Sequence, residues 1–248
     1  MGGRKNNEDS YGTYDSSVSA LSYTVVSEGR SESVRLEDAG TTEANEILAA
    51  VVADGLGGHE GGELASRWAV REFLGSLVRD IRNGTDTVEA IKRSYGSARA
   101  AVLAHAPKDS ATTLTAAVMD RGRLYIGNVG DSRSYVIDSG RLILRTKDHS
   151  FVQSLLDAGA VDEQEARTHP RKNILTRALG SDPSEPDIYC IGGVWDTVLL
   201  CSDGACGVMS DDEIMRLVVV DGKAKTIVDM SLAKGSQDNS TAILMNRA

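Results

Sequence analysis

The chain has 248 residues, 41% hydrophobic and 25% charged, which is the composition of a globular protein large enough to bury a substantial core. Its formal net charge is −9 and no basic stripe runs along it, which argues against a nucleic-acid-binding protein. No stretch approaches the roughly 20 apolar residues of a membrane span, and the polar first residues lack the apolar core of a signal peptide, so we expect no membrane partner.

The first half of the chain predicts two strands followed by two helices. The strands are Leu21–Val26 and Ile47–Ala53, and the second is a continuous apolar run that stops at Asp54, as a buried strand does before a tight turn. In the predicted helices, Glu63–Arg82 and Thr87–Ala104, apolar residues recur at helical spacing. Each helix therefore carries one apolar stripe to be buried against a sheet.

Four short segments rich in β-forming residues come next, separated by turn-forming residues. This pattern predicts an antiparallel meander. The four segments are Thr112–Met119, Leu124–Val129, Ser134–Ile137 and Leu142–Arg145.

The last part of the chain mixes short helices with strands. Ser210 and Glu213 have the spacing of a capping box, which predicts a helix start. The other predicted helices are Phe151–Ala158, Asp162–Arg167 and Lys223–Lys234, and the predicted strands are Thr197–Cys201 and Thr241–Met245. Helices in pairs and strands in hairpin runs, without strict alternation, indicate an α+β fold. No linker composition interrupts the chain, so residues 1–248 are predicted to form a single domain.

Three cysteines are present, Cys190, Cys201 and Cys206, and no two of them form a CxxC pair. An odd count at these spacings argues against a disulfide framework and against a structural zinc site. A reducing cytoplasm therefore fits the chain best, and we interpret the three thiols as packing residues.

Three aspartates occupy similar places beside predicted strands. Asp54 and Asp203 each end a strand before a glycine, and Asp238 directly precedes the last strand. The sheet would hold these short carboxylates rigidly, and bound cations would compensate their charge. Oxygen ligands without His or Cys favour Mg²⁺ or Mn²⁺ over zinc. The alternative is that each Asp forms a turn or caps a helix, and the pattern alone leaves both interpretations open.

Several segments carry distinctive motifs: RKNNEDSYG (Arg4–Gly12), VVADGLGGHEGGELAS (Val51–Ser66), ATTLTAAV (Ala111–Val118), IGNVGDSRSYV (Ile126–Val136), LTRALGSD (Leu175–Asp182), LLCSDGACGVMSDDEI (Leu199–Ile214) and SQDNSTAIL (Ser236–Leu244). In this order they resemble the successive motifs of the metal-dependent protein phosphatases of type 2C, over nearly the whole chain. The combination of DGxGGH, GDSR, SDG and DN is highly specific. Residues 146–170 resemble the mobile flap of the bacterial-type branch.

The resemblance implies a four-layer α-β-β-α sandwich, in which two mainly antiparallel sheets are flanked by helices. A flap of about residues 146–180 is inserted, and metal ions lie in a cleft at one edge of the sheets. The resemblance also implies that Asp54 bridges two Mn²⁺ or Mg²⁺ ions and that the carbonyl group of Gly55 binds one of them. Asp203 and Asp238 would complete the protein ligands of the first ion.

Other site residues follow from the same resemblance. Glu8 and Asp9 match acidic positions that hold metal-bound waters. Asp131 matches a residue that, with Asp203, binds a third and weaker metal ion in bacterial-type members. Arg4 matches the arginine that grips the substrate phosphate, a role that suits the bidentate geometry of a guanidinium group.

The chemistry implied is direct hydrolysis by a metal-bridging hydroxide that attacks phosphorus opposite the leaving serine or threonine oxygen. The source of the leaving-group proton stays open. His59 is either the general acid or a structural hydrogen-bonding residue, and a metal-bound water could replace it.

Three functions are compatible with these residues. The first is a metal-dependent serine/threonine protein phosphatase, a monomer acting on phosphorylated substrates of a serine/threonine kinase. The second is a pseudophosphatase that binds phosphoproteins without turnover. The third is an enzyme for small phosphoesters. The presence of the metal-binding aspartates favours the first, because pseudophosphatases typically lose one.

Overall fold

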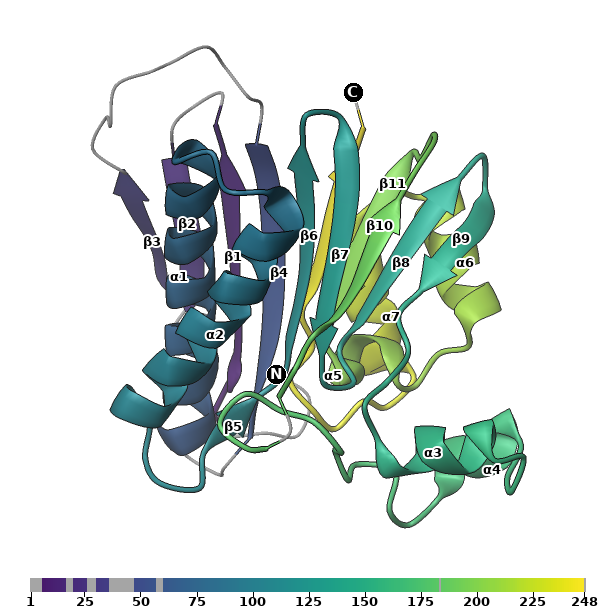
Figure 1. Cartoon of the computed structure of the whole chain (residues 1–248). Coiled ribbons are helices and arrows are strands. Elements are labelled where there is room, and N and C mark those ends of the chain that lie inside the picture. Colours follow the sequence, from purple (N-terminus) through teal and green to yellow (C-terminus); the bar gives the residue numbers. More distant parts are fainter. Residues whose placement is uncertain are drawn as a thin grey trace.

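The computed structural model describes residues 6–16, 20–25, 30–35, 47–56, 60–182 and 184–247. The strands in these segments form two sheets that pack face to face, and helices cover both outer faces (Figure 1). The predicted α+β class and the four-layer α-β-β-α sandwich are therefore confirmed.

The larger sheet is antiparallel throughout. Its strand order is β10-β7-β6-β4-β1-β2-β3, and β5 pairs with the end of β4. The strands are β1 (Asp9–Asp15), β2 (Ala20–Val25), β3 (Arg30–Arg35), β4 (Ile47–Leu56), β5 (Ala111–Thr112), β6 (Leu114–Asp120), β7 (Arg123–Val129) and β10 (Asp187–Ile191).

The smaller sheet corrects the predicted meander. Its order is β12-β11-β8-β9, with β8 (Arg133–Asp138), β9 (Arg141–Arg145), β11 (Thr197–Cys201) and β12 (Ala242–Asn246). Hence β6 and β7 form a hairpin in one sheet, and β8 and β9 form a hairpin in the other. The chain crosses between the sheets at residues 130–132. Turn residues identify hairpins, but the sheet that each hairpin joins depends on long-range pairing, here of β7 with β10 and of β8 with β11.

Two long helices, α1 (Glu60–Arg82) and α2 (Thr87–His105), cover the outer face of the larger sheet. Side chains of β4 alternate between the two faces of the sheet, as the pleat requires. Val51 packs with Phe73 and Leu77 against the helices, whereas Val52 faces the second sheet. Burial of each large side chain stabilises the fold by roughly 1.5–3 kcal/mol. None of the described helices is long and apolar enough to cross a membrane.

The smaller sheet is covered by α5 (Asp203–Cys206), α6 (Asp211–Val220) and α7 (Ala224–Ala233). The predicted capping box is confirmed at the start of α6. The hydroxyl of Ser210 accepts a hydrogen bond from the Glu213 amide, and Glu213 Oε2 accepts one from the Ser210 amide at 2.9 Å.

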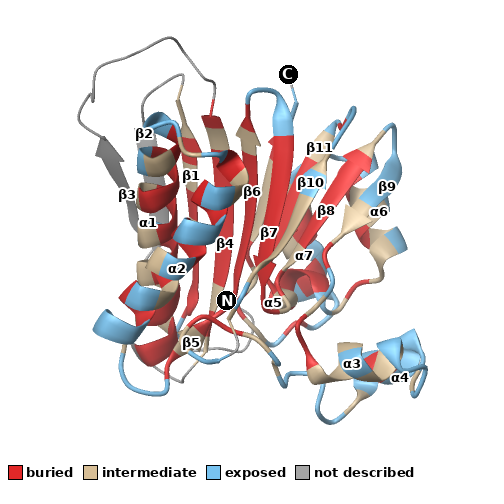
Figure 2. Ribbon diagram, viewed as in Figure 1, coloured by how far each residue is buried: buried red, intermediate tan, exposed pale blue. Residues whose placement is uncertain are grey.

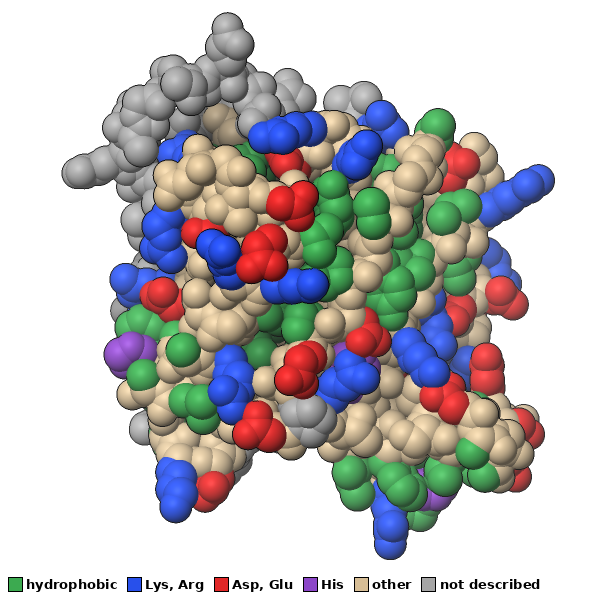
Figure 3. All heavy atoms as spheres, in the orientation of Figure 1, with side chains coloured by type: hydrophobic (Ala, Val, Ile, Leu, Met, Phe, Trp, Pro, Cys, Tyr) green, Lys and Arg blue, Asp and Glu red, His purple; other side chains and the backbone are tan. Residues whose placement is uncertain are grey.

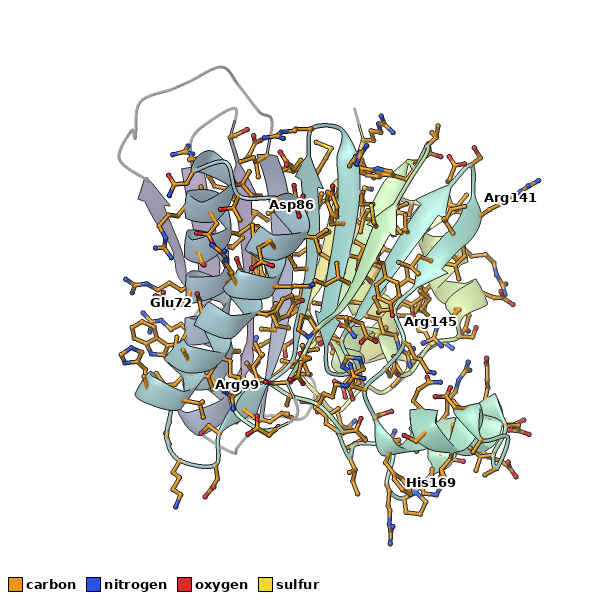
Figure 4. The ribbon with its side chains drawn as sticks, in the orientation of Figure 1. Glu72, Asp86, Arg99, Arg141, Arg145 and His169 are labelled. Carbon is orange, nitrogen blue, oxygen red and sulfur yellow. The ribbon has the colours of Figure 1, made fainter. Side chains whose placement is uncertain are left out.

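The flap consists of α3 (Phe151–Asp157) and α4 (Glu163–Thr168), which project from the sandwich (Figure 1). Most of its surface is exposed or half-buried (Figure 2), and among its helical residues Ala166 alone is buried. Its two ends pair through the amide of Phe151 and the carbonyl of Ile174, at 2.8 Å. After the flap, Asp182 forms an ion pair with Arg99 of α2 at 2.7 Å (Figure 4).

Several local predictions were wrong. Strands β1 and β10 were missed, because β1 is rich in polar residues and β10 is short and half-exposed. Strand β4 does not stop at Asp54 but continues to Leu56, because β5 pairs with its last residues. Asp203 begins α5, so it is separated from the end of β11 by one residue. Cys190 is exposed and is no packing residue, whereas Cys201 and Cys206 are buried as predicted.

Candidate active site

Segments far apart in the sequence meet at one end of the two sheets, where β1 begins and β4, β7 and β11 end (Figure 1). The strand register places Asp9 opposite Asp54 on neighbouring strands. Asp131 lies where the chain crosses from β7 to β8, Asp203 follows β11, and Asp238 precedes β12. The fold thus brings together all five aspartates that the sequence singled out.

Asp9 is the most deeply buried of these carboxylates, with 1% of its surface exposed. Its Oδ2 accepts hydrogen bonds from the hydroxyls of Ser202 (2.8 Å) and Thr241 (2.7 Å). Its Oδ1 is buried and has no hydrogen-bond partner among the described residues. Burial, assisted by the negative charges of Asp203 and Asp238, raises the pKa of Asp9 to about 7 despite the two hydrogen bonds.

The carboxylates of Asp54, Asp131 and Asp203 form a repulsive group. Burial is the main cause that raises the pKa of each of them. The charge of Asp203 raises the pKa of both Asp54 and Asp131 further. The interaction between the two carboxyl groups raises the pKa of Asp54 and lowers that of Asp203. In the absence of other positive charge, this group cannot stay fully ionised.

Two threonines fix the backbone of Asp54. Thr113 Oγ1 accepts a hydrogen bond from the Asp54 amide at 2.9 Å, and Thr112 Oγ1 donates one to its carbonyl oxygen at 2.9 Å. Thr113 Oγ1 also contacts the hydroxyl of Ser132 at 2.8 Å, next to Asp131. The orientation of Asp54 is therefore tied to the chain crossing that carries Asp131.

The segment before β1 is clamped to the same site. The side chain of Asn239 accepts a hydrogen bond from the Glu8 amide (2.9 Å) and donates one to the Asn6 carbonyl (3.1 Å). The Glu8 carbonyl in turn accepts hydrogen bonds from the Gly55 amide (3.2 Å) and the Ser66 hydroxyl (2.6 Å). Glu8 and Gly55, both predicted site residues, are thus held directly beside the aspartates.

A cleft of about 420 Å³ opens beside the aspartates, between the flap and the helices of the smaller sheet. Asp131, Asp203 and Asp238 line it on the side of the sheets. Its flap side includes the apolar residues Val152 and Leu156. Acidic and basic side chains are intermixed over the region where the flap joins the sheets (Figure 3).

Two arginines in the cleft are engaged in ion pairs. Arg133 binds Asp148 with two hydrogen bonds, of 2.9 Å from Nε and 2.7 Å from Nη2. Arg145, the last residue of β9 (Figure 4), contacts Asp211 at 3.1 Å and Asp148 at 3.5 Å. These pairs hold the flap stem to the smaller sheet, so we assign both arginines a supporting role.

The residues at this site fit divalent cations. The donor set consists of carboxylate oxygens, which Mg²⁺ and Mn²⁺ prefer, and Asp9 Oδ1 and Asp203 Oδ1 are buried without partners. In the part of the chain that the structure describes, no three His, Cys, Asp or Glu side chains already surround one point as ligands. The fit therefore depends on the unpaired oxygens and on the mutual repulsion of the carboxylates, which cations would relieve.

The raised carboxyl pKa values predict an unusual pH dependence of stability. Because Asp9 has a pKa of about 7 in the folded chain and about 3.9 when unfolded, the folded state binds more protons between these values. Protein treated with EDTA should therefore lose stability as the pH rises from about 4 to about 7. Mn²⁺ should stabilise it most at the upper end of that range, because protons compete with the metal.

Urea unfolding across this pH range, with EDTA or with Mn²⁺, measures the effect. Asp9→Asn is the matched variant, because it keeps the hydrogen-bond acceptor and removes the titration. The lowered pKa of buried His149 acts in the opposite direction, but wild type and variant share it. Equal pH dependence in the two proteins would contradict the prediction.

Two predicted site residues, Arg4 and His59, lie outside the described residues. The remaining predicted residues, Glu8, Asp9, Asp54, Gly55, Asp131, Asp203 and Asp238, are all placed at this end of the sheets. Sequence reasoning missed Ser202 and Thr241 as supports of the site. The available signal was polar residues at the ends of otherwise apolar strands, in CSDG and SQDNSTAIL.

Comparisons with known proteins agree with this arrangement. A family model described as "Protein phosphatase 2C" matches residues 29–220. The serine/threonine phosphatase stp of Listeria welshimeri is 34% identical over 215 residues, which cover 79% of this chain and 83% of the relative.

Two solved structures show the same fold. The serine/threonine phosphatase Stp1 from Staphylococcus aureus has a TM-score of 0.72 and 28% identity, over 99% of this chain and 91% of that one. The catalytic domain of the serine threonine protein phosphatase PstP, in complex with 2 manganese ions, has a TM-score of 0.70 and 28% identity, over 95% and 98% of the two chains.

Proposed function

Because the chain belongs to the protein phosphatase 2C family, we propose that it is a metal-dependent phosphatase that removes phosphate from serine and threonine side chains of phosphorylated proteins. The observation that carries this proposal is the convergence of five aspartates, from both sheets, beside a cleft of about 420 Å³. The three hydrophobic clusters, one in each space between the layers of the sandwich, support a single domain over residues 1–248, with the flap of about 146–180 as an insertion.

Asp54, Asp203 and Asp238, with the carbonyl group of Gly55, are the residues that we propose as direct ligands of two Mn²⁺ or Mg²⁺ ions. Asp131 is the proposed ligand of a third ion. When bound, such ions lower the pKa of a coordinated water and neutralise charge on the substrate phosphate.

The chain's own residues supply position and charge. Asp9 is held by Ser202 and Thr241, so its unpaired Oδ1 is fixed in place to accept a hydrogen bond from a water in the site. We propose the same outer role for Glu8, which the Asn239 clamp holds beside Gly55. Arg4 would bind the phosphate oxygens by its guanidinium group, and His59 is a candidate donor of the leaving-group proton.

Two other functions remain as outcomes of a direct test. We expect Mn²⁺-dependent hydrolysis of a phosphothreonine peptide and of p-nitrophenyl phosphate, and no hydrolysis of either in EDTA. Turnover of the small ester alone would favour a small-phosphoester hydrolase. Binding of the phosphopeptide without turnover of either compound would favour the pseudophosphatase. Both results would contradict the proposed protein phosphatase activity.

A further inference from the structure

His149 lies at the stem of the flap and makes two hydrogen bonds to a single residue, Gly130. Its backbone amide donates to the Gly130 carbonyl at 2.9 Å, and its ring Nδ1 accepts from the Gly130 amide at 3.1 Å. The side chain is buried, with 5% of its surface exposed. Because Nδ1 accepts a hydrogen bond, the ring proton of neutral His149 is on Nε2.

Gly130 directly precedes Asp131, and several neighbouring groups restrict its backbone conformation. Its φ of 106° lies in the left-handed region that favours glycine. A Cβ at this position would lie 2.5 Å from the Thr113 side chain. The Asn128 side chain binds the Gly130 carbonyl as well, at 3.2 Å. The two bonds from His149 therefore fix both peptide groups that flank Gly130, and the second of these leads into Asp131.

The other edge of the imidazole is held by residues that follow the flap. Nε2 donates to Asp187 Oδ2 at 3.1 Å, and Arg177 donates to Asp187 Oδ1 at 2.7 Å. The carbonyl of His149 accepts a hydrogen bond from the Thr176 amide at 2.8 Å, where the chain returns from the flap. Burial and the Arg177 charge lower the pKa of His149, despite Asp187, which keeps Nδ1 able to accept.

We propose that His149 is a positioning residue that couples the flap stem to Asp131, by holding the Gly130 amide on one ring edge and Asp187 on the other. This inference depends on the proposed function at one point, because it takes the cleft that Asp131 lines as the substrate site. Movement of the flap stem changes the ring position, and the ring position sets the direction in which the Asp131 carboxylate points.

Two substitutions separate the contact of the His149 ring with Gly130 from its contact with Asp187. In His149→Asn, the side-chain oxygen reaches about as far as Nδ1, so the Gly130 bond is kept and the Asp187 bond is lost. In His149→Gln, the longer side chain reaches Asp187, and the Gly130 amide loses its acceptor. His169→Gln is the matched control, because His169 Nδ1 accepts from the Arg171 amide at 3.1 Å within the flap, away from Gly130.

The first readout is independent of enzyme activity. We expect hydrogen exchange of the Gly130 amide to accelerate about tenfold in His149→Gln and to change little in His149→Asn. Trypsin should cleave the flap, at the exposed residues Arg167, Arg171 and Lys172, faster in both variants than in wild type, because each loses one half of the coupling. The His169→Gln control should leave the Gly130 amide unchanged.

The second readout is catalysis. In His149→Gln, the Mn²⁺ concentration for half-maximal activity should rise about tenfold, the effect typical of lost outer-shell support. His149→Asn should restore most of that loss, which a general packing defect would not do. Unchanged Gly130 exchange in His149→Gln, or equal losses in both variants, would overturn the proposal. A wild-type protein without phosphatase activity would refute the proposed function alone, because the exchange and proteolysis results would still decide the coupling.

Discussion

Asp203→Asn is expected to lower kcat for a phosphothreonine peptide by about 1,000-fold at saturating Mn²⁺, since several kcal/mol of transition-state stabilisation depend on bound cations. The change removes a charge and almost no volume. It also removes one of the charges that repel Asp54 and Asp131, so the metal-free protein should be at least as stable as wild type. Steady-state kinetics and urea unfolding in EDTA measure the two effects separately.

Asp120→Asn is the matched control for this experiment. Asp120 is also a buried aspartate with an unpaired Oδ1, but it lies at the opposite end of the larger sheet, where its Oδ2 accepts a hydrogen bond from Thr87 at 2.6 Å. The kcat of the Asp120→Asn variant should match that of wild type. An Asp203→Asn protein that keeps more than about a tenth of the wild-type kcat would contradict the assignment of Asp203 as a metal ligand.

Gly204→Ala should destabilise the protein by about 3 kcal/mol or more and abolish Mn²⁺-dependent activity. A Cβ on Gly204 would overlap the carbonyl oxygen of Asn239 and would lie 3.2 Å from the Cβ of Asp238. The backbone carbonyl of Asn239 cannot rotate away from the added methyl group as a flexible side chain could. The clash therefore forces α5 away from the segment before β12. That separation moves Asp203 away from Asp238 and disturbs the Asn239 clamp. Urea unfolding and phosphatase assays measure both consequences.

Gly75→Ala provides the contrast within the same chain. Gly75 lies inside α1, and a Cβ there would meet no atom within 4 Å. Replacing glycine by alanine within a helix should increase stability by about 0.5–1 kcal/mol and leave activity unchanged. If Gly204→Ala behaved like Gly75→Ala, the close packing between α5 and the Asn239 backbone would not support the site.

The elements with strong local periodicity were predictable from the sequence. The two long helices begin and end within three residues of their predicted limits, and β11 has the predicted limits, Thr197–Cys201. The start of α6 was also predictable, because the capping box depends only on the four residues from Ser210 to Glu213. In contrast, β1 begins at the carboxylate site and carries many polar residues, so its sequence lacks the apolar pattern that identifies a strand. The sheet joined by each hairpin depends on partners far away in the sequence, which no local pattern contains.

The candidate site was predictable in part for a similar reason. Asp54 and Asp203 stand out because each interrupts an apolar run before a glycine. The supports of the site do not stand out. The side chain of Asn239 holds the Asn6–Glu8 segment, and its backbone amide binds Asp238 at 2.9 Å. Such roles depend on which chain segments meet, and only the fold determines that.

The chain passes from one sheet to the other at Gly130, and this crossing makes the candidate site depend on the packing of the two sheets against each other. Because the aspartates are divided between the two sheets, neither sheet alone provides all the carboxylate oxygens of the proposed metal site. Loosening of the apolar contacts between the layers would disperse the carboxylates before either sheet itself came apart. Metal ions bound by the proposed ligands would therefore link the two sheets, and their uptake should report whether the two sheets are packed together.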